Sequence, residues 1–472
     1  MLRFLQLQES TVVRRSQILN DLARLVDQEA LVSSSEELRA FETDALTAYR
    51  RPPLAAVLPR TTAEVSAILQ YCNAQNIRVV PRGAGTSLAG GAIPQEDAIV
   101  VCISKMTEVI EVDCTNRFIR VQAGITNLRV TEAVSRYGFF YAPDPSSQLA
   151  CTIAGNIAMN SGGAHCLKYG VTTNHLIAAE FVLADGTVVE VGRATDIPGL
   201  DLLGVLCGSE GQLGIVTEAT LRILPSPEAV RPVLFGFASS EDAGTCAAAI
   251  VEAGIVPVAI EFMDKLAIEI TEAYAHAGYP LDVEAMLIVE VEGSSAEISE
   301  QLALLIEIAR ANGACTIKEA QSALEAALIW KGRKSAFGAT GRVADYICMD
   351  GTVPMGQLPF VLKRTREIVQ SYGLRVANVF HAGDGNMHPL IMFDINDPQE
   401  RNKAEQAGND ILKLCVEVGG CLTGEHGVGL EKRDLMTLQF SAEDLRQQMA
   451  VKTAFDPMWL LNPSKVFPLD FR

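Results

Sequence analysis

Three of the six histidines lie between His381 and His426, and their spacing suits metal chemistry. The segment from Asn378 to Pro389 is predicted to form the end of a strand, a Gly-Asp-Gly turn and the start of a second strand, so His381 and His388 can face each other on neighbouring strands. Glu425 follows in a loop flanked by glycines. Two histidines and one glutamate form a ligand set of catalytic zinc that leaves one coordination position open. We therefore predict a divalent metal on His381, His388 and Glu425, zinc first, with Mn or Fe as alternatives because they accept the same ligands.

His426 directly follows the proposed ligand Glu425. Adjacent side chains diverge, so this imidazole cannot easily bind the same metal as Glu425. Its ordinary pKa of about 6.5 leaves it substantially neutral at neutral pH, and a nearby dication favours the neutral form further. We predict that His426 acts as a general base.

A second group of candidate residues lies in glycine-rich loops of the first half of the chain. The run from Pro81 to Gly91 follows a predicted strand, and its glycines let backbone N–H groups approach a phosphate closely. It is neither a P-loop, because Gly91-Ala92 replaces Lys-Ser/Thr, nor a GxGxxG motif. A tight turn is the alternative interpretation. Three similar loops follow, and together they favour a long, polyphosphate-bearing ligand: Pro143–Ser147, Ile153–Gly170 and Gly208–Ile215.

Regular elements are predicted to carry these loops. Thr61 to Glu64 is a capping-box signature before an apolar i, i+3, i+4, i+7 pattern, which predicts a helix ending near Cys72. Asp185-Gly186 between two apolar runs predicts a β-hairpin. After Pro225-Ser226-Pro227 the sequence repeats strand–helix–strand units. Such units favour an α+β layer, a sheet covered by helices on one face.

Length and composition indicate a large globular protein of more than one domain. At about 150 residues per domain, 472 residues predict about three. The apolar share of 49% is enough for a sizeable core. We divide the chain into a helical N-terminal extension (1–50), a first domain (51–226) and a second domain (227–472), whose last ~50 residues are predicted to pack back on the first.

Charge and cysteine usage limit the partners and the compartment. The 39 basic and 57 acidic residues give a net charge of −18, which disfavours nucleic acid. The longest apolar runs, such as Ala98–Ile103, are too short for a membrane helix, and the N-terminus lacks the apolar core of a signal peptide. The 11 cysteines include no CxxC pair, so neither a disulfide framework nor a thiolate zinc site is indicated. These features predict a cytoplasmic protein.

The order of the glycine-rich motifs resembles a known cofactor domain. PRGAGTSLAGG, PDPSS, IAGNIAMNSGG with YG, and GSEGQLGI are similar to the FAD-binding domain of the vanillyl-alcohol-oxidase-type flavoproteins over about residues 50 to 225. That resemblance implies that the first loop holds the FAD diphosphate. Thr86 stands where members with covalent flavin carry His, which implies non-covalent FAD. The implied FAD-binding residues are Pro81, Arg82, Gly83, Ala84, Gly85, Thr86, Ser87, Pro143, Ser146, Ser147, Gly155, Asn156, Asn160, Gly162, Gly163, Gly170, Glu210, Gly211, Gly214, Ile215 and Asn462.

The C-terminal motifs extend the resemblance over nearly the whole chain. HAGDGNMH and GEHG are similar to the FAD-linked D-2-hydroxyacid dehydrogenases, and the pattern is nearest to the FAD-linked subunit of bacterial glycolate oxidase. This implies a two-domain α+β flavoprotein whose C-terminal substrate (cap) domain has an antiparallel sheet covered by helices. Arg333 falls at the family's carboxylate-anchoring arginine, and a guanidinium suits a planar carboxylate. Phe337 and Cys348 stand where dicarboxylate-using relatives carry Thr and Lys, which implies a small monocarboxylate.

The combined expectation is oxidation of a small 2-hydroxy acid, glycolate first and D-lactate second, to the 2-oxo acid. Arg333 would anchor the carboxylate, the metal would bind substrate oxygens, and His426 would take the hydroxyl proton while a hydride passes to flavin N5. The resemblance implies companion subunits, including an iron–sulfur protein, peripheral attachment to the inner membrane through them, and a possible homo-oligomer. Alternatives are another D-2-hydroxy acid, a non-catalytic FAD or electron-transfer subunit, and a non-redox transferase that makes ether lipids on FAD.

Overall fold

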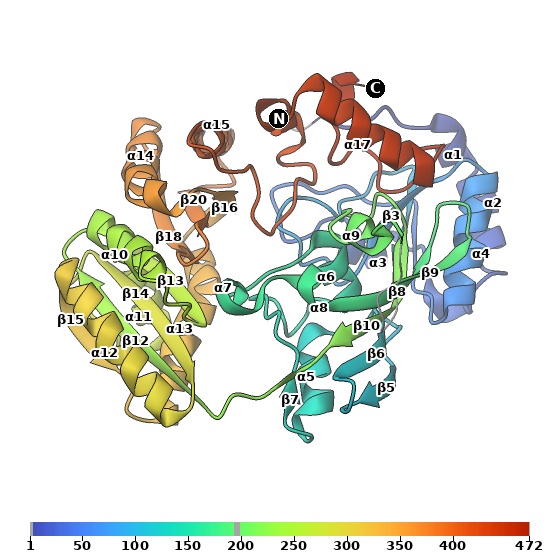
Figure 1. Cartoon of the computed structure of the whole chain (residues 1–472). Coiled ribbons are helices and arrows are strands. Elements are labelled where there is room, and N and C mark those ends of the chain that lie inside the picture. Colours follow the sequence, from blue (N-terminus) through green and yellow to red (C-terminus); the bar gives the residue numbers. More distant parts are fainter. Residues whose placement is uncertain (1–2, 193–198, 472) are drawn as a thin grey trace. The chain divides into compact units, whose positions relative to one another are not determined.

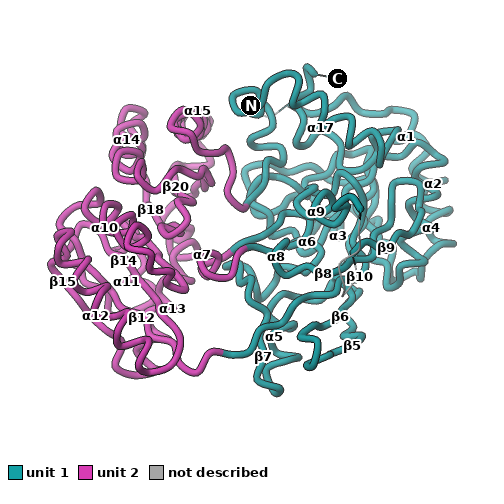
Figure 2. Tube along the Cα trace, in the orientation of Figure 1, with its two compact units in different colours: residues 1–162, 171–226, 426–472 teal, residues 163–170, 227–425 magenta. Residues whose placement is uncertain are grey.

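A computed structural model describes residues 3–192 and 199–471 as two compact units. Unit 1 comprises residues 1–162, 171–226 and 426–472, and unit 2 comprises residues 163–170 and 227–425 (Figure 2). Each unit has its own sheets and helices (Figure 1). The three domains expected from the chain length are therefore too many. Each of the two units is larger than the ~150 residues taken as the size of one domain.

Unit 1 is built from a mixed sheet and an antiparallel sheet. The strand order β1-β2-β4-β3 includes the parallel neighbours β2, β4 and β3, and the order β5-β6-β10-β8-β9 is antiparallel throughout. The strands are β1 (Leu31–Val32), β2 (Ala55–Val57), β3 (Arg78–Arg82), β4 (Ala98–Cys102), β5 (Val109–Asp113), β6 (Phe118–Gln122), β7 (Phe139–Phe140), β8 (Leu176–Val182), β9 (Val188–Gly192), β10 (Ile215–Arg222) and β11 (Leu224–Pro225). The helices are α1 (Glu9–Val13), α2 (Arg15–Leu22), α3 (Ser35–Leu38), α4 (Thr62–Ala74), α5 (Asn127–Ser135), α6 (Ile153–Met159), α8 (Thr172–His175), α9 (Leu202–Leu206), α16 (Met436–Gln439) and α17 (Ala442–Phe455).

Local signals in unit 1 give the expected elements. The Thr61 hydroxyl accepts the Glu64 amide at the start of α4, and the helix buries Val65 and Ile68 in the core. The Glu64 carboxylate accepts the Arg60 amide, so the reciprocal half of the capping box is displaced by one residue. β8 and β9 pair as a hairpin across the Asp185-Gly186 turn. The predicted helix and hairpin are confirmed.

Residues 1–50 are more than a helical extension. They contain short helices, but Leu31–Val32 forms β1 and pairs with β2. Ile18 and Leu22 lie one helical turn apart in α2 and join the core of unit 1. The physical reason is that this apolar stripe must be buried, although the surrounding residues are polar.

Unit 2 contains a larger antiparallel sheet. Its order is β15-β12-β14-β13-β18-β19-β17, and β20 pairs with both β18 and β16. The strands are β12 (Ala229–Phe237), β13 (Ala259–Asp264), β14 (Ala285–Gly293), β15 (Ala314–Glu319), β16 (Asp345–Cys348), β17 (Gly351–Thr352), β18 (Arg375–His381), β19 (Asn386–Met387) and β20 (Pro389–Phe393). The helices are α7 (Cys166–Tyr169), α10 (Ser240–Glu252), α11 (Lys265–Ala275), α12 (Ser295–Ala311), α13 (Ala323–Val343), α14 (Leu358–Ser371) and α15 (Pro398–Glu417).

Helices cover both faces of the unit 2 sheet. Met286 and Ile288 of β14 pack with residues of α11 and α13, while α10 and α12 also contact β14. Leu287 and Val289, which point to the opposite face, are buried as well. The expectation of helices on a single face is therefore wrong, because the continuous apolar run of β14 requires cover on both sides. No helix within the described ranges is both long and apolar enough to cross a membrane.

Candidate functional site

The glycine-rich loops of unit 1 meet at the ends of β3 and α6. A Cβ on Gly83 would lie 2.2 Å from the Thr152 hydroxyl oxygen, so the first loop passes directly against the start of α6. A Cβ on Gly211 would lie 3.2 Å from the Pro81 ring, which brings the loop before β10 to the same place. The Asn127 amide joins two further loops, because it donates to the Pro143 carbonyl and to the Asn156 side chain, at 3.0 Å each.

The end of α6 is tied to the loop that precedes β10. Asn160 ends the helix in the left-handed conformation, and its side-chain oxygen accepts the Thr173 amide. The Gly208 amide donates to the Ile157 carbonyl and the Glu210 amide to the Ala158 carbonyl, at 2.8 Å each. Four loops that are distant in sequence therefore lie together within unit 1.

Several predicted FAD-binding side chains have identifiable partners. The Arg82 guanidinium donates to the backbone carbonyls of Thr43 at 2.8 Å and Ala40 at 3.4 Å. The buried Ser87 hydroxyl has no hydrogen-bond partner in the structure, which fits a ligand oxygen. The Asn462 side chain donates to the carbonyls of Gly91 and Glu210. Pro81, Ala84, Gly85, Thr86, Ser146, Ser147, Gly155, Gly162, Gly214 and Ile215 also lie in unit 1, whereas Gly163 and Gly170 belong to the unit 2 segment.

The Glu210 side chain accepts hydrogen bonds from two backbone amides of the protein. Its Oε1 accepts the Val428 amide and its Oε2 accepts the Gly429 amide, both at 2.7 Å. Burial raises the pKa of this carboxyl, while the two amides act in the opposite direction. All these groups belong to unit 1. Glu210 therefore fixes the loop that directly follows His426.

We expect Glu210→Gln to lower the thermal stability of unit 1. The substitution leaves one buried backbone amide facing an amide NH2 group, and an unsatisfied buried donor costs about 1–3 kcal/mol. At about 2–4 °C per kcal/mol for a unit of this size, that corresponds to a fall in Tm of about 2–12 °C. Calorimetry measures it, with Glu218→Gln as the control, because the Arg120–Glu218 pair is partly exposed and contributes little. Equal Tm values for the two variants would contradict this role.

The histidine cluster of unit 2 is built on β18 and the turn after it. In the strand register, His381 is paired with Glu261 on β13 and with Asn386 on β19. The turn is tight, because a Cβ on Gly385 (φ +71°) would lie 2.2 Å from the Val353 carbonyl oxygen. His388 follows β19, and its ring centroid lies 5.2 Å from that of His381. The two imidazoles are thus neighbours, although they do not occupy directly paired positions.

Glu425 completes a group of three possible metal ligands. Its Oε1 lies 3.3 Å from His381 Nε2 and 3.4 Å from His388 Nε2. One ligand atom from each residue lies within 4.8 Å of the other two. This spacing is compatible with three ligands around one ion at distances of about 2.0–2.2 Å.

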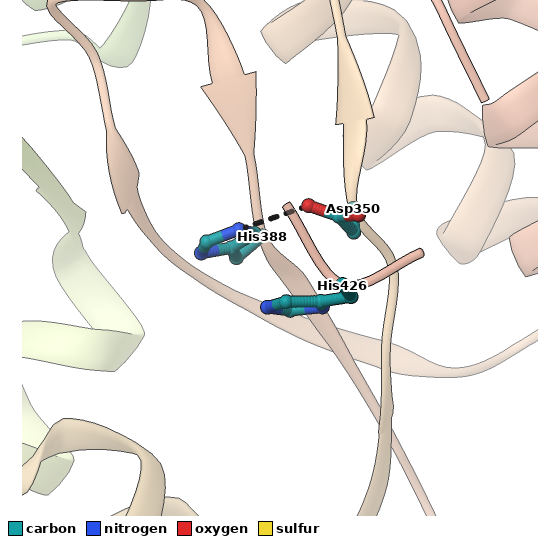
Figure 3. A group of neighbouring side chains, drawn as sticks. All are labelled: Asp350, His388 and His426. Atoms are coloured by element: carbon teal, nitrogen blue, oxygen red, sulfur yellow. Dashed lines mark ion pairs between the residues drawn. The ribbon is translucent and has the colours of Figure 1, made fainter. Parts of the chain in front are cut away.

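Asp350 shapes the loop that carries Glu425. Its carboxylate accepts the Thr423 hydroxyl and the backbone amides of Gly424 and Glu425. Its Oδ1 also lies 3.3 Å from His388 Nε2, and the dashed line in Figure 3 marks this pair. His426, the third side chain drawn there, is the first residue of the C-terminal segment of unit 1.

Arg333 is joined to the same cluster through Glu261. Arg333 lies on α13 and is 3% exposed, so its ion pair is buried and does not lie on the surface. Its Nη2 lies 2.6 Å from Glu261 Oε2, and Glu261 Oε1 lies 2.7 Å from His381 Nδ1. The Arg333 Nε donor has no hydrogen-bond partner in the structure, and Nη2 has the ion pair with Glu261 but no hydrogen bond of good geometry. Donors of this kind suit an anionic ligand.

The charges in the cluster shift its pKa values strongly. Burial lowers the pKa of His381, but Glu261 and Glu425 outweigh it and raise that pKa well above the ordinary value. Burial likewise raises the pKa of Glu261, but Arg333 and His381 outweigh it and the pKa ends below the ordinary value. The cluster therefore favours carboxylates beside a positive charge, either a proton or a cation.

Sequence reasoning missed Glu261 and Asp350. Glu261 lies in the apolar run Val258–Met263, and one acid in such a run is a signal for a buried, paired carboxylate. Asp350 lies between β16 and β17, where its role depends on the distant segment Thr423–Glu425. No local pattern identifies that partner.

Comparisons with known proteins agree on one family. Residues 226–466 match the model of the C-terminal domain of FAD linked oxidases, and residues 53–192 match that of an FAD binding domain. The chain is 46% identical to "Glycolate oxidase subunit GlcD" of Escherichia coli (strain K12), covering 97% of this chain and 92% of that protein. It is 34% identical to "D-lactate dehydrogenase" of Archaeoglobus fulgidus, covering 95% and 98%.

Solved structures show the same fold. A 4-ethylphenol oxidase from Gulosibacter chungangensis superimposes with a TM-score of 0.83 at 15% identity, over 100% of both chains. A p-cresol methylhydroxylase superimposes with a TM-score of 0.81 at 16% identity, over 96% and 97%. With the two matching domains and the close relatives, these likenesses show that the chain belongs to the FAD-linked oxidases, oxidoreductases with the two-domain α+β fold of the vanillyl-alcohol-oxidase type.

Proposed function

We propose that this protein oxidises a small 2-hydroxy acid, glycolate or D-lactate, to the corresponding 2-oxo acid. The observation that carries the proposal is the convergence of His381, His388 and Glu425 in a unit that also holds Arg333. The relatives named above are a glycolate oxidase subunit and a D-lactate dehydrogenase. A 2-hydroxy acid carries a carboxylate for the arginine and two oxygens for a metal.

Charge supports a divalent metal at the three ligands. Glu261, Glu425, Asp350 and Arg333 together carry −3 + 1 = −2 when both imidazoles are neutral, and Asp384, whose pKa burial raises to about 6, is a further acidic group beside them. A dication offsets this negative charge, whereas a buried cluster without one needs protons. When bound, the metal supplies a Lewis acid that lowers the pKa of the substrate hydroxyl. Zinc is the metal that we propose for this ligand set, and Mn or Fe are the alternatives.

Each protein group then has one task. Arg333 orients the substrate carboxylate, and His426, held one residue from Glu425 by the chain, accepts the hydroxyl proton. The C2–H bond breaks with its electron pair, and the C2–O bond becomes the carbonyl. Bound FAD supplies the acceptor of that hydride at N5, so two electrons and one proton leave C2 together. Thr86 at the covalent-link position supports non-covalent FAD.

The side chains that lie near His388 favour a small substrate. The Phe337 ring centroid lies 6.1 Å from that of His388 and 6.2 Å from that of Tyr346. Cys348 is buried close by on β16. Neither side chain can pair with a second carboxylate, so we propose discrimination against 2-hydroxyglutarate.

Partner chains are part of the proposal. The relatives from Escherichia coli and Bacillus subtilis are both named as subunits. We propose that this chain works with companion chains, one of them an iron–sulfur protein, because the 11 cysteines are dispersed and hold no cluster pattern. Such partners would also account for a peripheral membrane location.

Anaerobic mixing with substrate tests the function directly. We expect glycolate or D-lactate to bleach the oxidised flavin of the metal-loaded protein, and 2-hydroxyglutarate to leave it oxidised. His426→Asn is expected to slow bleaching by about a hundredfold or more, the usual contribution of a general base. An oxidised flavin with both small acids would reject the substrate proposal. Unchanged turnover of His426→Asn in the assembled complex would instead favour a non-catalytic electron-transfer subunit.

A further inference from the structure

We propose that Glu261 is a positioning residue that sets the metal ligand His381 and the carboxylate anchor Arg333 relative to each other. The proposal rests on the function proposed above and adds a residue to it. Glu261 lies on β13, in register with His381 on β18. Its Oε1 lies 2.7 Å from His381 Nδ1, and its Oε2 lies 2.6 Å from Arg333 Nη2. One carboxylate therefore uses each of its oxygens for a different predicted site residue.

The first contact selects the form of His381 that can bind a metal. With Nδ1–H donating to Glu261, the lone pair of a neutral imidazole is on Nε2. Nε2 is the atom that faces Glu425, at 3.3 Å. Carboxylate partners of this kind fix the tautomer and ring orientation of metal-bound histidines, and their loss typically weakens metal affinity 10–100-fold.

The second contact fixes the guanidinium of Arg333. Glu261 is fully buried and Arg333 is 3% exposed, so water cannot readily replace either partner. The pairs Phe262–Phe380 and Glu261–His381 are adjacent in the register of β13 and β18, and the two phenyl rings stack with centroids 4.6 Å apart. This packing holds Glu261 rigidly between the helix α13 and the strand β18.

The consequence is a fixed separation between the two groups that bind the substrate. A substrate whose carboxylate pairs with Arg333 can present its C2 oxygen to the metal only if that separation is constant. Rigid positioning of this kind acts on binding and on chemistry, whereas a purely structural carboxylate affects stability alone.

Glu261→Gln tests the assignment, with Asp264→Asn as the matched control. Asp264 lies three residues along the same strand. Its Oδ1 accepts the Ala267 amide at the start of α11, and its Oδ2 accepts the backbone and side-chain amides of Asn378 on β18, so this control also ties β13 to the strand of His381 without pairing with His381 or Arg333 itself. For Glu261→Gln we expect zinc affinity of the chelator-stripped protein to fall 10–100-fold and KM for glycolate to rise at least tenfold. FAD content should not change, because all the predicted FAD-binding residues except Gly163 and Gly170 belong to unit 1. Asp264→Asn should keep the wild-type zinc affinity and KM.

A second measurement separates positioning from folding. In the wild-type protein the His381 Nδ1 proton should give a downfield NMR signal that is absent from Glu261→Gln. Where Glu261→Gln fails to fold, Glu261→Asp keeps the charge with a shorter reach and should show the same loss of zinc affinity. Wild-type zinc affinity and KM in a folded Glu261 variant would overturn the proposal. Failure of wild-type protein to oxidise any 2-hydroxy acid, with zinc affinity still dependent on Glu261, would reject the proposed function alone.

Discussion

Replacing His388 by alanine is expected to abolish metal binding and to lower kcat/KM for glycolate by about a thousandfold or more. His388 Nε2 is one of three ligand atoms that lie within 4.8 Å of one another, and two ligands alone hold zinc poorly. A Lewis acid contributes several kcal/mol to stabilising the developing charge, and each 1.4 kcal/mol is about tenfold in rate. Metal analysis and anaerobic flavin reduction, measured on the same sample, check both parts.

His276→Asn is the matched control for this prediction. His276 lies in the same unit, at the C-terminal end of α11 and with a left-handed φ of 49° that asparagine tolerates. It should keep full metal content and rate. Removal of the metal from the wild-type protein with a chelator should reproduce the His388→Ala result. Added zinc should then restore the activity of the chelated wild-type protein but not that of His388→Ala. A His388→Ala protein that retains metal and rate would show that the three residues are not a metal site.

The second large effect is expected at Arg333. Arg333→Lys keeps the positive charge beside Glu261 but loses the planar fork that pairs with a carboxylate in two places. We expect KM for glycolate to rise about 10–100-fold with a smaller change in kcat, because uniform binding is lost. Steady-state kinetics over a panel of 2-hydroxy acids measures the split. Arg333→Met should be much less stable, since it leaves the Glu261 carboxylate buried without its cation, at a cost of about 3–5 kcal/mol.

Arg342→Lys is the control for Arg333→Lys. Arg342 lies on the same helix, α13, over the Tyr274 ring. The substitution should leave KM unchanged. A simple alcohol without a carboxylate provides the complementary measurement, because its poor turnover should not depend on Arg333. Equal KM values for Arg333→Lys and wild-type protein would remove Arg333 from substrate binding.

Local sequence signals determined the elements of unit 1 well. The Thr61 cap and the apolar spacing of α4 act within a few residues, so the helix can be predicted without knowledge of the rest of the chain. The Asp185-Gly186 turn determines the β8–β9 hairpin in the same way. The prediction that helices cover only one face of the unit 2 sheet was wrong, because periodicity does not show whether one or both faces of a strand are buried.

The sequence by itself also determined the chemical types at the site, through the spacing of His381 and His388 and the glycine-flanked Glu425. Only the tertiary structure decided that Glu261 joins His381 to Arg333 and that Asp350 binds the Thr423–Glu425 loop. The reason is that these contacts depend on strand register and on packing between segments more than fifty residues apart. A residue's type is written in the sequence, whereas its partner across a sheet is set by the pairing of distant strands.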